Sequence, residues 1–109
     1  MTLEEHLRGR KVIYVMRRFD FFKIGCSSDI CRRYGSKRSL STIILVIPVP
    51  DEMNIFSAEK MVHDLFREKN VDGFETFDLS PDDLNILEGI FFYGGKMEVH
   101  RVDPALLSL

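Results

Sequence analysis

Two strand-length apolar segments, 11–16 (KVIYVM) and 21–25 (FFKIG), are separated by only four residues of the chain. Both alternating sets of positions in the first segment are β-branched or aromatic, which is typical of a central strand. So short a connection requires the two strands to lie antiparallel, as a hairpin. Gly25 ends the second segment, and we expect the chain to turn sharply there into the element that follows.

The remaining pattern predicts further elements on this hairpin. Residues 27–40 read as a helix, with either Ser28 or Asp29 as its cap and with one face formed by Ile30, Arg33, Tyr34 and Lys37. A third strand is predicted over 41–50 and ends in two prolines. The clearest helix is 54–70, whose apolar stripe consists of Ala58, Met61, Val62, Leu65 and Phe66.

The C-terminal part contains one more helix signal. Ser80 caps a predicted helix over 80–93, with Pro81 at its first position and Asp83 completing a capping box. Residues 96–102 alternate in polarity and form either a terminal strand or an arm. The element order predicts an α+β fold in which helices cover a small, mostly antiparallel sheet. At 109 residues the chain is expected to form a single domain, 1–109.

Composition restricts the compartment. No apolar run approaches the ~20 residues of a membrane span, and the polar first eleven residues lack the apolar segment of a secretory signal. We therefore expect an intracellular protein, cytoplasmic or nuclear. A disulfide between Cys26 and Cys31 would be unusual in a reducing compartment, so both are interpreted as small side chains near a turn.

Charge is unevenly distributed along the chain. Residues 1–40 hold ten of the fifteen Lys and Arg but four of the seventeen Asp and Glu, so they carry +6 and the remainder carries −8. A basic half can form a phosphate-facing surface even when the total charge is acidic. The alternative, which the sequence leaves open, is that the two halves interleave in space and cancel.

Several polar side chains around the hairpin could meet at one anion. Tyr14 and Lys23 can project from one face of neighbouring strands. Backbone N–H groups after Gly25 begin a helix, where anions bind well, and Arg33 lies one turn into that helix. Taken singly, each side chain has a structural explanation: a core tyrosine, a lysine whose stem lies along the sheet, and an arginine on a solvated helix face.

A phosphate-cleaving site usually also needs a metal ion and a carboxylate to hold it. Glu59 is the best candidate because it lies at the rim of the apolar stripe of the helix over 54–70. His63 is one turn further on the same side, although a Glu and a His four residues apart are commonly a surface pair. Mg²⁺ binds one or two carboxylates and keeps several waters.

These residues follow one another with the spacing of a known family. "VIY" (12–14) and "KIG" (23–25) resemble the two motifs that give the GIY-YIG endonuclease superfamily its name, and Arg33 stands where its catalytic arginine lies. "SAEKMVHDLF" (57–66) resembles the helix that carries the family's metal-binding glutamate, at Glu59. The K-I-G variant is most similar to the viral and phage branch. The resemblance covers residues 11–79, leaving 80–109 as a C-terminal extension with a helix and either a terminal strand or an arm.

The resemblance implies a three-stranded antiparallel sheet flanked by helices, and an enzyme that hydrolyses DNA phosphodiester bonds with Mg²⁺ or Mn²⁺ in DNA processing, repair or recombination. It implies that Tyr14 takes part in proton removal from water, that Arg33 stabilises the phosphate, that Glu59 holds the metal and that His63 relays a proton or orients Glu59. It implies that Lys23 binds phosphate. The DNA-binding set is Lys23, Ser27, Arg32, Arg33, Lys37 and Arg38.

The chain departs from the family pattern at two motif positions. Val12 replaces the first glycine, and Lys23 replaces the second tyrosine, which removes one proton carrier. The alternative function is therefore a catalytically weak or inactive DNA-binding module of the same fold; a third reading is an unrelated interaction domain. The expected partner is DNA, with a homodimer or a second protein supplying further affinity. No membrane partner is expected.

Overall fold

The computed structural model describes residues 8–30, 32 and 42–99, and its centre is an antiparallel sheet with the strand order β3-β1-β2-β4. The strands are β1 (Val12–Arg18), β2 (Phe21–Ser27), β3 (Ile43–Pro48) and β4 (Thr76–Phe77). The α+β class predicted from the sequence is confirmed. The two-residue β4 adds a fourth strand to the three that the family resemblance implied, because it pairs with Phe22 and Lys23 of β2.

The predicted hairpin is present, and it is longer than expected. β1 and β2 pair from Val12↔Ser27 to Arg18↔Phe21, so the connecting turn consists of two residues, Phe19 and Asp20. Gly25 lies inside β2, and the expectation that it ends the strand is wrong. The change of direction comes after Ser27 instead.

The helix expected over 27–40 falls largely outside the described residues. Ile30 and Arg32 are helical, and the Asp29 side-chain oxygen Oδ1 accepts a hydrogen bond from the Arg32 backbone N–H at 3.2 Å. Of the two candidate caps, Asp29 is therefore the one that the structure shows in a capping position.

The next helix, α4, spans Ile55–Leu65 and is followed by a short 3-10 helix, η1 (Arg67–Lys69). It begins at Asn54, whose side chain accepts hydrogen bonds from the backbone N–H groups of Phe56 and Ser57. The helix predicted over 54–70 is confirmed in position, and its last residues tighten into the 3-10 turn.

The final helix, α5, spans Pro81–Glu88 and begins with the predicted capping box between Ser80 and Asp83. The expectation that it continues to residue 93 is wrong. Residues 90–93 form β5 (Ile90–Tyr93), which pairs with β6 (Lys96–Val99) as a separate hairpin. Burial alternates along β5, which is the two-residue period of a strand and not that of a helix.

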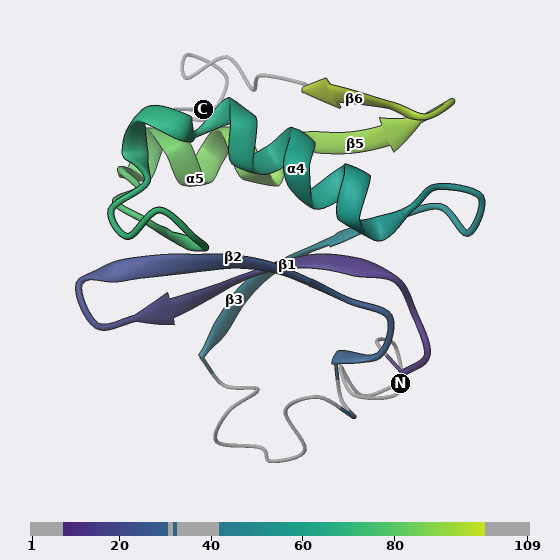
Figure 1. Cartoon of the computed structure of the whole chain (residues 1–109), viewed down its shortest axis with the longest axis horizontal. Coiled ribbons are helices and arrows are strands. Elements are labelled where there is room, and N and C mark those ends of the chain that lie inside the picture. The colour runs from purple at the N-terminus through teal and green to yellow at the C-terminus, as the bar shows by residue number, and fades with distance from the viewer. Residues whose placement is uncertain (1–7, 31, 33–41, 100–109) are drawn as a thin grey trace, which may run out of the picture.

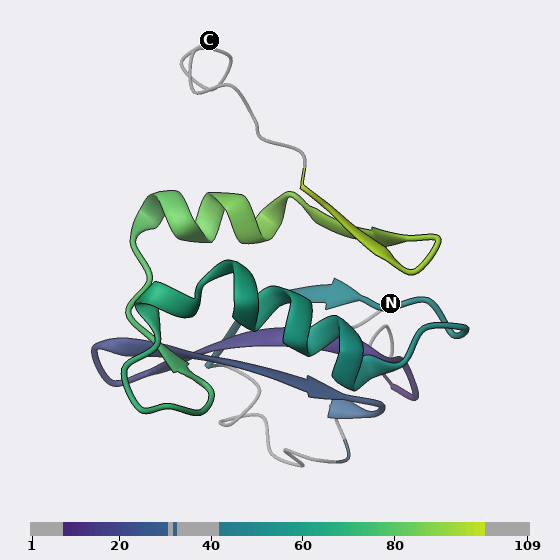
Figure 2. The same ribbon diagram turned by 45° about the horizontal axis from the view of Figure 1, so that its top comes forward.

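α4, α5 and the β5–β6 hairpin lie on one side of the four-stranded sheet (Figures 1 and 2). The main core fills the space between them and includes Ile13, Val15, Ile24, Ala58 and Val62. A second, smaller cluster of Val12, Tyr14 and Ile30 belongs to the opposite face of β1, because side chains alternate along a strand. The sheet therefore has two faces with different roles: one is covered by helices, and the other carries Tyr14.

Among the described residues, no helix combines the length and the apolar character needed to cross a membrane.

Candidate active site

Tyr14 and Gly25 are opposite each other on β1 and β2, and this pairing positions the candidate site. Tyr14 is fully buried, and its ring lies across Gly25: a β-carbon added at residue 25 would be 2.6 Å from both the Cζ atom and the hydroxyl oxygen of Tyr14. No real side chain is accommodated at that distance. Glycine is therefore required at position 25 because it leaves space for the tyrosine ring, and not because the chain turns there.

Lys23 lies on the same face as Tyr14, two residues before Gly25 on β2. Its ammonium nitrogen Nζ is 5.8 Å from the centroid of the Tyr14 ring, within the range of a cation–π contact. The Lys23 side chain is only 15% exposed. The structure thus brings together the phenol and the ammonium that the sequence placed on neighbouring strands.

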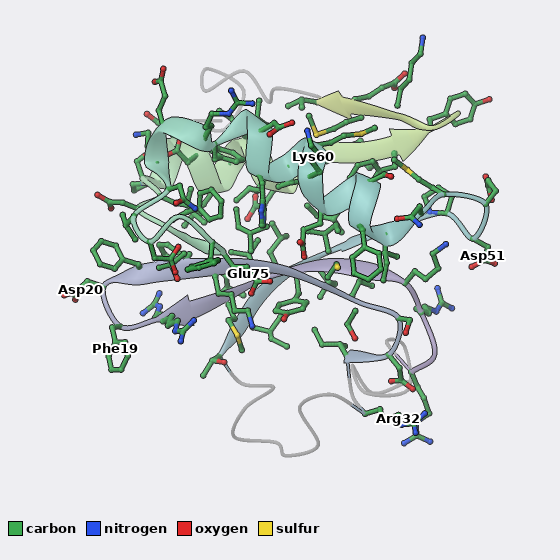
Figure 3. All side chains as sticks on the ribbon, viewed as in Figure 1. Phe19, Asp20, Arg32, Asp51, Lys60 and Glu75 are labelled. Carbon is green, nitrogen blue, oxygen red and sulfur yellow. The ribbon has the colours of Figure 1, made fainter. Side chains whose placement is uncertain are left out.

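A carboxylate that the sequence did not single out as a site residue completes this group. The Glu75 oxygen Oε2 is 3.3 Å from Lys23 Nζ, and the Glu75 side chain is 40% exposed. Glu75 directly precedes β4, beside β2 (Figure 3). Its backbone carbonyl also accepts a hydrogen bond from Ile24 N–H, so Glu75 is attached to β2 through both its main chain and its side chain.

The loop that carries Glu75 is held by two side chains that bind backbone groups. Asn70 accepts from Gly73 N–H and donates to the Phe74 carbonyl. Asp72 accepts from the N–H groups of Phe74 and Thr76. Hydrogen bonds from Thr76 and Phe74 lower the pKa of Asp72 below its ordinary value, so the carboxylate that organises the loop stays charged. These hydrogen bonds fix the conformation of the loop that holds Glu75 beside Lys23.

Glu59 and His63 come from α4, which covers the other face of the sheet. The main-core residues Ala58 and Val62 of α4 pack with Ile13, Val15 and Ile24. His63 Nε2 is 2.8 Å from the Ile24 carbonyl oxygen, and because a carbonyl only accepts, Nε2 donates. The His63 ring also lies against Phe77, with 5.0 Å between ring centroids.

The hydrogen bond between His63 and the Ile24 carbonyl places one flank of α4 at the edge of β2. The N–H of Ile24 bonds to Glu75 on the β4 side, and in an antiparallel strand the carbonyl of the same residue points the same way. His63 therefore lies at this outer edge, and Glu59 lies one turn earlier on the same flank. The Glu59 side chain is half-buried and makes no ion pair with any of the described residues.

The remaining candidates divide into two groups. Arg33, Lys37 and Arg38 lie outside the described residues. Ser27 is buried, and its hydroxyl accepts a hydrogen bond from Asp29 N–H at 3.1 Å, so it shapes the turn after β2. Arg32 is exposed, and it lies at the opposite end of the β1–β2 hairpin from Phe19 (Figure 3).

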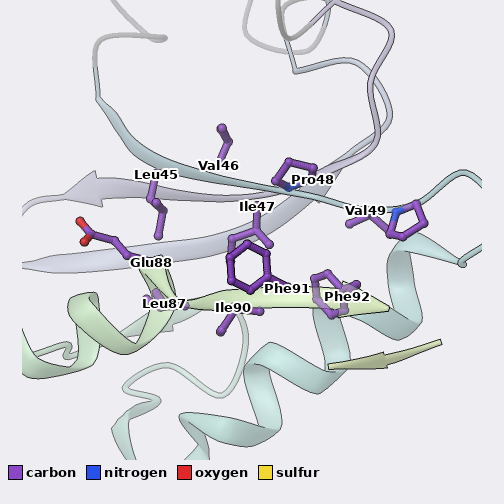
Figure 4. A pocket seen from close by; sticks show the side chains of 11 residues that line it. Leu45, Val46, Ile47, Pro48, Val49, Leu87, Glu88, Ile90, Phe91 and Phe92 are labelled. Carbon is purple, nitrogen blue, oxygen red and sulfur yellow. The ribbon is translucent and has the colours of Figure 1, made fainter. Parts of the chain in front are cut away.

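An apolar cavity of about 440 Å³ lies elsewhere, between β3 and the α5–β5 connection (Figure 4). Residues of β3 and its extension line one side, and the other side is lined by Leu87, Glu88, Ile90, Phe91 and Phe92. None of the candidate catalytic residues lines it. The cavity is large, but its lining is mainly apolar and holds none of the candidate residues, so we do not assign phosphate chemistry to it.

No group of three or more His, Cys, Asp or Glu side chains that could hold a metal ion is present in the part of the chain that the structure describes. A metal held by a single protein carboxylate, with water and substrate oxygens as the other ligands, is the arrangement that Glu59 can provide. The half-buried carboxylate of Glu59, without an ionic partner among the described residues, fits that limited task.

Fold and site together define a small α+β domain whose central hairpin carries a tyrosine–lysine pair on the face away from the helices. A family model described as the T5orf172 domain matches residues 11–87, and the chain therefore belongs to the T5orf172 domain family. The comparisons with curated proteins and with solved structures gave no match.

Proposed function

We propose that this protein is a metal-dependent endonuclease of the GIY-YIG type, which hydrolyses phosphodiester bonds in DNA. The observation that carries the proposal is the register of β1 and β2, which seats the Tyr14 ring across Gly25 and brings the Lys23 ammonium beside that ring. Membership of the T5orf172 family supports it, since that phage-origin domain is associated with nuclease-type proteins.

In this mechanism Tyr14 accepts a proton, and Lys23 binds the negatively charged phosphate. In its phenolate form, Tyr14 takes a proton from the attacking water as that water bonds to phosphorus. Lys23 binds a non-bridging phosphate oxygen and balances the charge that develops there. The bond from phosphorus to the leaving oxygen breaks, that oxygen takes a proton from solvent, and Tyr14 returns its own proton to solvent, which restores the phenolate. Arg33 is proposed to bind the same phosphate through two donors of its guanidinium.

Glu59 would hold Mg²⁺ or Mn²⁺, which when bound stabilises negative charge on the leaving oxygen. His63 has a different role in this proposal: its ring nitrogen is engaged by the Ile24 carbonyl, so it fixes the flank of α4 that carries Glu59. It is a positioning residue for the carboxylate and not a proton carrier.

A second function, a DNA-binding module with little or no cleavage, is favoured by one observation. α4, which carries Glu59, packs against the face of the sheet opposite Tyr14. The two functions differ in what they require of Glu59. A nuclease loses its activity without that carboxylate, whereas a binding module is unaffected or binds more tightly when a negative charge near phosphate is removed.

A plasmid-nicking assay with Mg²⁺ or Mn²⁺ tests the proposal. Tyr14→Phe, Glu59→Gln and Arg33→Ala should each reduce cleavage by at least about 100-fold, and Arg33→Ala should also weaken DNA binding. Glu68→Gln is the matched control because it removes the same charge from an exposed residue of η1. Cleavage that persists in Glu59→Gln argues against the site; DNA binding by the parent without cleavage under any metal supports the binding module.

A further inference from the structure

The turn between β1 and β2 presents an aromatic residue in an unusual way. Phe19 is 94% exposed and has a backbone φ of 58°, making it the one non-glycine residue with positive φ in the part of the chain that the structure describes. Glycine, Asn or Asp is the ordinary choice for that conformation, and a bulky residue adopts it at a cost. The fold gains no burial from Phe19 in return.

The neighbours of Phe19 are cationic. Arg17 and Arg18 precede it, both are exposed, and neither forms an ion pair with the described residues. Because successive side chains of a strand point to opposite faces, the two guanidinium groups flank the turn on both sides. Asp20 is the one acidic residue in the segment.

The turn also belongs to the same hairpin as the candidate site. Phe21 pairs with Arg18, and Lys23 lies two residues further along β2, about 7 Å at the rise of a strand. Figure 3 shows Phe19 projecting from the turn on the side of the sheet away from α4, which is the side of the Tyr14 ring. A DNA strand bound at Lys23 can therefore pass the turn within a few nucleotides.

We propose that Phe19, with Arg17 and Arg18, forms a contact for an unpaired DNA base, in which the phenyl ring stacks on the base and the arginines bind the adjoining phosphates. The occupant follows from charge and shape: an exposed aromatic face between cationic groups is the arrangement that binds single-stranded nucleic acid. This inference rests on the proposed function, since it names the form of DNA that the same site would take: single-stranded, branched or looped.

Phe19→Gly separates the binding role from the structural one because it should change the two in opposite directions. Glycine adopts positive φ freely, so the variant should be at least as stable as the parent in thermal unfolding. Its affinity for a fluorescent single-stranded oligonucleotide, measured by anisotropy without metal, should fall at least five-fold, as expected for about one lost base–aromatic stack. Affinity for a blunt duplex should change less than two-fold.

Two further variants sharpen the experiment. Tyr93→Ala removes another highly exposed aromatic, from the turn end of the other hairpin, and should leave single-strand affinity unchanged. Phe19→Leu keeps an apolar side chain but no aromatic face, so it should lose most of the affinity that Phe19→Gly loses. A 2-aminopurine base in the oligonucleotide should be quenched by the parent and not by Phe19→Leu.

The outcomes distinguish this inference from the proposed function. If the parent binds DNA in a Lys23-dependent way and Phe19→Gly binds single strands equally well, the base contact is wrong and the nuclease proposal stands. An equal loss for duplex and single strand, or an equal loss in Tyr93→Ala, also overturns the base contact. If the parent binds neither form of DNA, both proposals fail.

Discussion

At the scale of single residues, Gly25 has no space for a side chain. Replacing it with alanine would bring a methyl group to 2.6 Å from the Tyr14 ring and hydroxyl. The ring is buried and cannot move without disturbing its cluster, so we expect Gly25→Ala to lower the free energy of unfolding by about 1–3 kcal/mol. DNA cleavage should fall further than stability explains, because Tyr14 is displaced from the phosphate. Urea unfolding and the nicking assay measure the two effects.

A double-mutant cycle identifies the cause of that loss. In a Tyr14→Leu background the smaller side chain leaves space at residue 25, so Gly25→Ala should cost much less than it does in the parent. An equal loss of unfolding free energy in both backgrounds would mean that Gly25 is required for its backbone conformation and not for the space that it leaves for Tyr14.

Glu75 leads to a different prediction, because its carboxylate lies where a phosphate bound to Lys23 would have to be. Like charges about 4 Å apart repel by roughly 1 kcal/mol in water and more in a shielded site. Glu75→Gln should therefore tighten DNA binding about five-fold or more at low salt, in an anisotropy assay without metal. Glu68→Gln changes the net charge equally, away from the ion pair, and should have a smaller effect. Weaker binding in Glu75→Gln would show instead that Glu75 holds Lys23 in position.

These residues also show what the sequence can and cannot predict. The placement of Tyr14 and Lys23 on one face was predictable, because strand alternation and a short turn fix which side chains share a face. The role of Gly25 was predicted wrongly, since a glycine after an apolar run is more often a turn than a space for a cross-strand ring. Glu75 gave no local signal, because its contact with Lys23 depends on where a loop fifty residues later returns to β2.

At the scale of elements, the start of α5 depends on a reciprocal pair of hydrogen bonds. Ser80 accepts from Asp83 N–H, and Asp83 accepts from Ser80 N–H. Ser80→Ala should lower the free energy of unfolding by about 1 kcal/mol. Burial alone would raise the pKa of Asp83, but the hydrogen bonds from Ser80 and the charge of Lys69 outweigh it, and the pKa lies below the ordinary 3.8.

That lowered pKa has a consequence for acid stability. A carboxylate with a lower pKa in the folded state stabilises the protein above its unfolded-state pKa, and this contribution is lost as the pH falls through the folded-state value. As the pH falls below the ordinary value of 3.8, the unfolding free energy of the parent should therefore fall more steeply than that of Asp83→Asn. Asp82→Asn removes a carboxylate from the same helical turn, outside the capping box, and should keep the steep dependence of the parent.

α4 offers a further test at this scale, because two of its residues are proposed to have different roles. His63→Leu removes the donor to the Ile24 carbonyl at the edge of β2, and should lower the free energy of unfolding by about 1–3 kcal/mol. Glu59→Gln should change stability by less than about 0.5 kcal/mol and still abolish cleavage. A large stability loss in Glu59→Gln would contradict the role of Glu59 as a metal ligand that the fold does not need.

Helix beginnings were predicted better than helix ends. Asn54 and Ser80 are of residue types that commonly precede a helix, and in the structure their side chains accept hydrogen bonds from N–H groups of the first turn. The end of α5 was missed because an apolar run such as 90–93 satisfies a helical or a strand period equally well over four residues. Pairing with the strand Lys96–Val99 makes residues 90–93 a strand, and such pairing cannot be predicted from either segment by itself.

At the scale of the whole molecule, the covered face of the sheet holds a core that extends beyond the matched family region. The family model ends at residue 87, yet Ile90 and Phe92 of β5 belong to the main core with Leu87. The β5–β6 hairpin is therefore part of the fold and not an appended arm. The sequence left residues 96–102 as either a terminal strand or an arm, and it did not predict that the residues before them pair with them and close the core.

Phe92 and Phe91 provide a matched pair to test this. They are adjacent on β5 and chemically identical, but Phe92 is 8% exposed and Phe91 is 55% exposed. Phe92→Ala should lower the free energy of unfolding by about 3–5 kcal/mol, since it removes a buried ring and leaves a cavity. Phe91→Ala should cost less than about 1 kcal/mol.

The expected loss in Phe92→Ala is a large part of the 5–15 kcal/mol that stabilises a typical domain. It should appear in urea unfolding as one cooperative transition at lower denaturant concentration with an unchanged slope, because the hairpin and the sheet share a single core. A separate early transition, with the sheet unfolding later at the parent's midpoint, would instead show that β5 and β6 unfold independently of the hairpin that carries Tyr14 and Lys23.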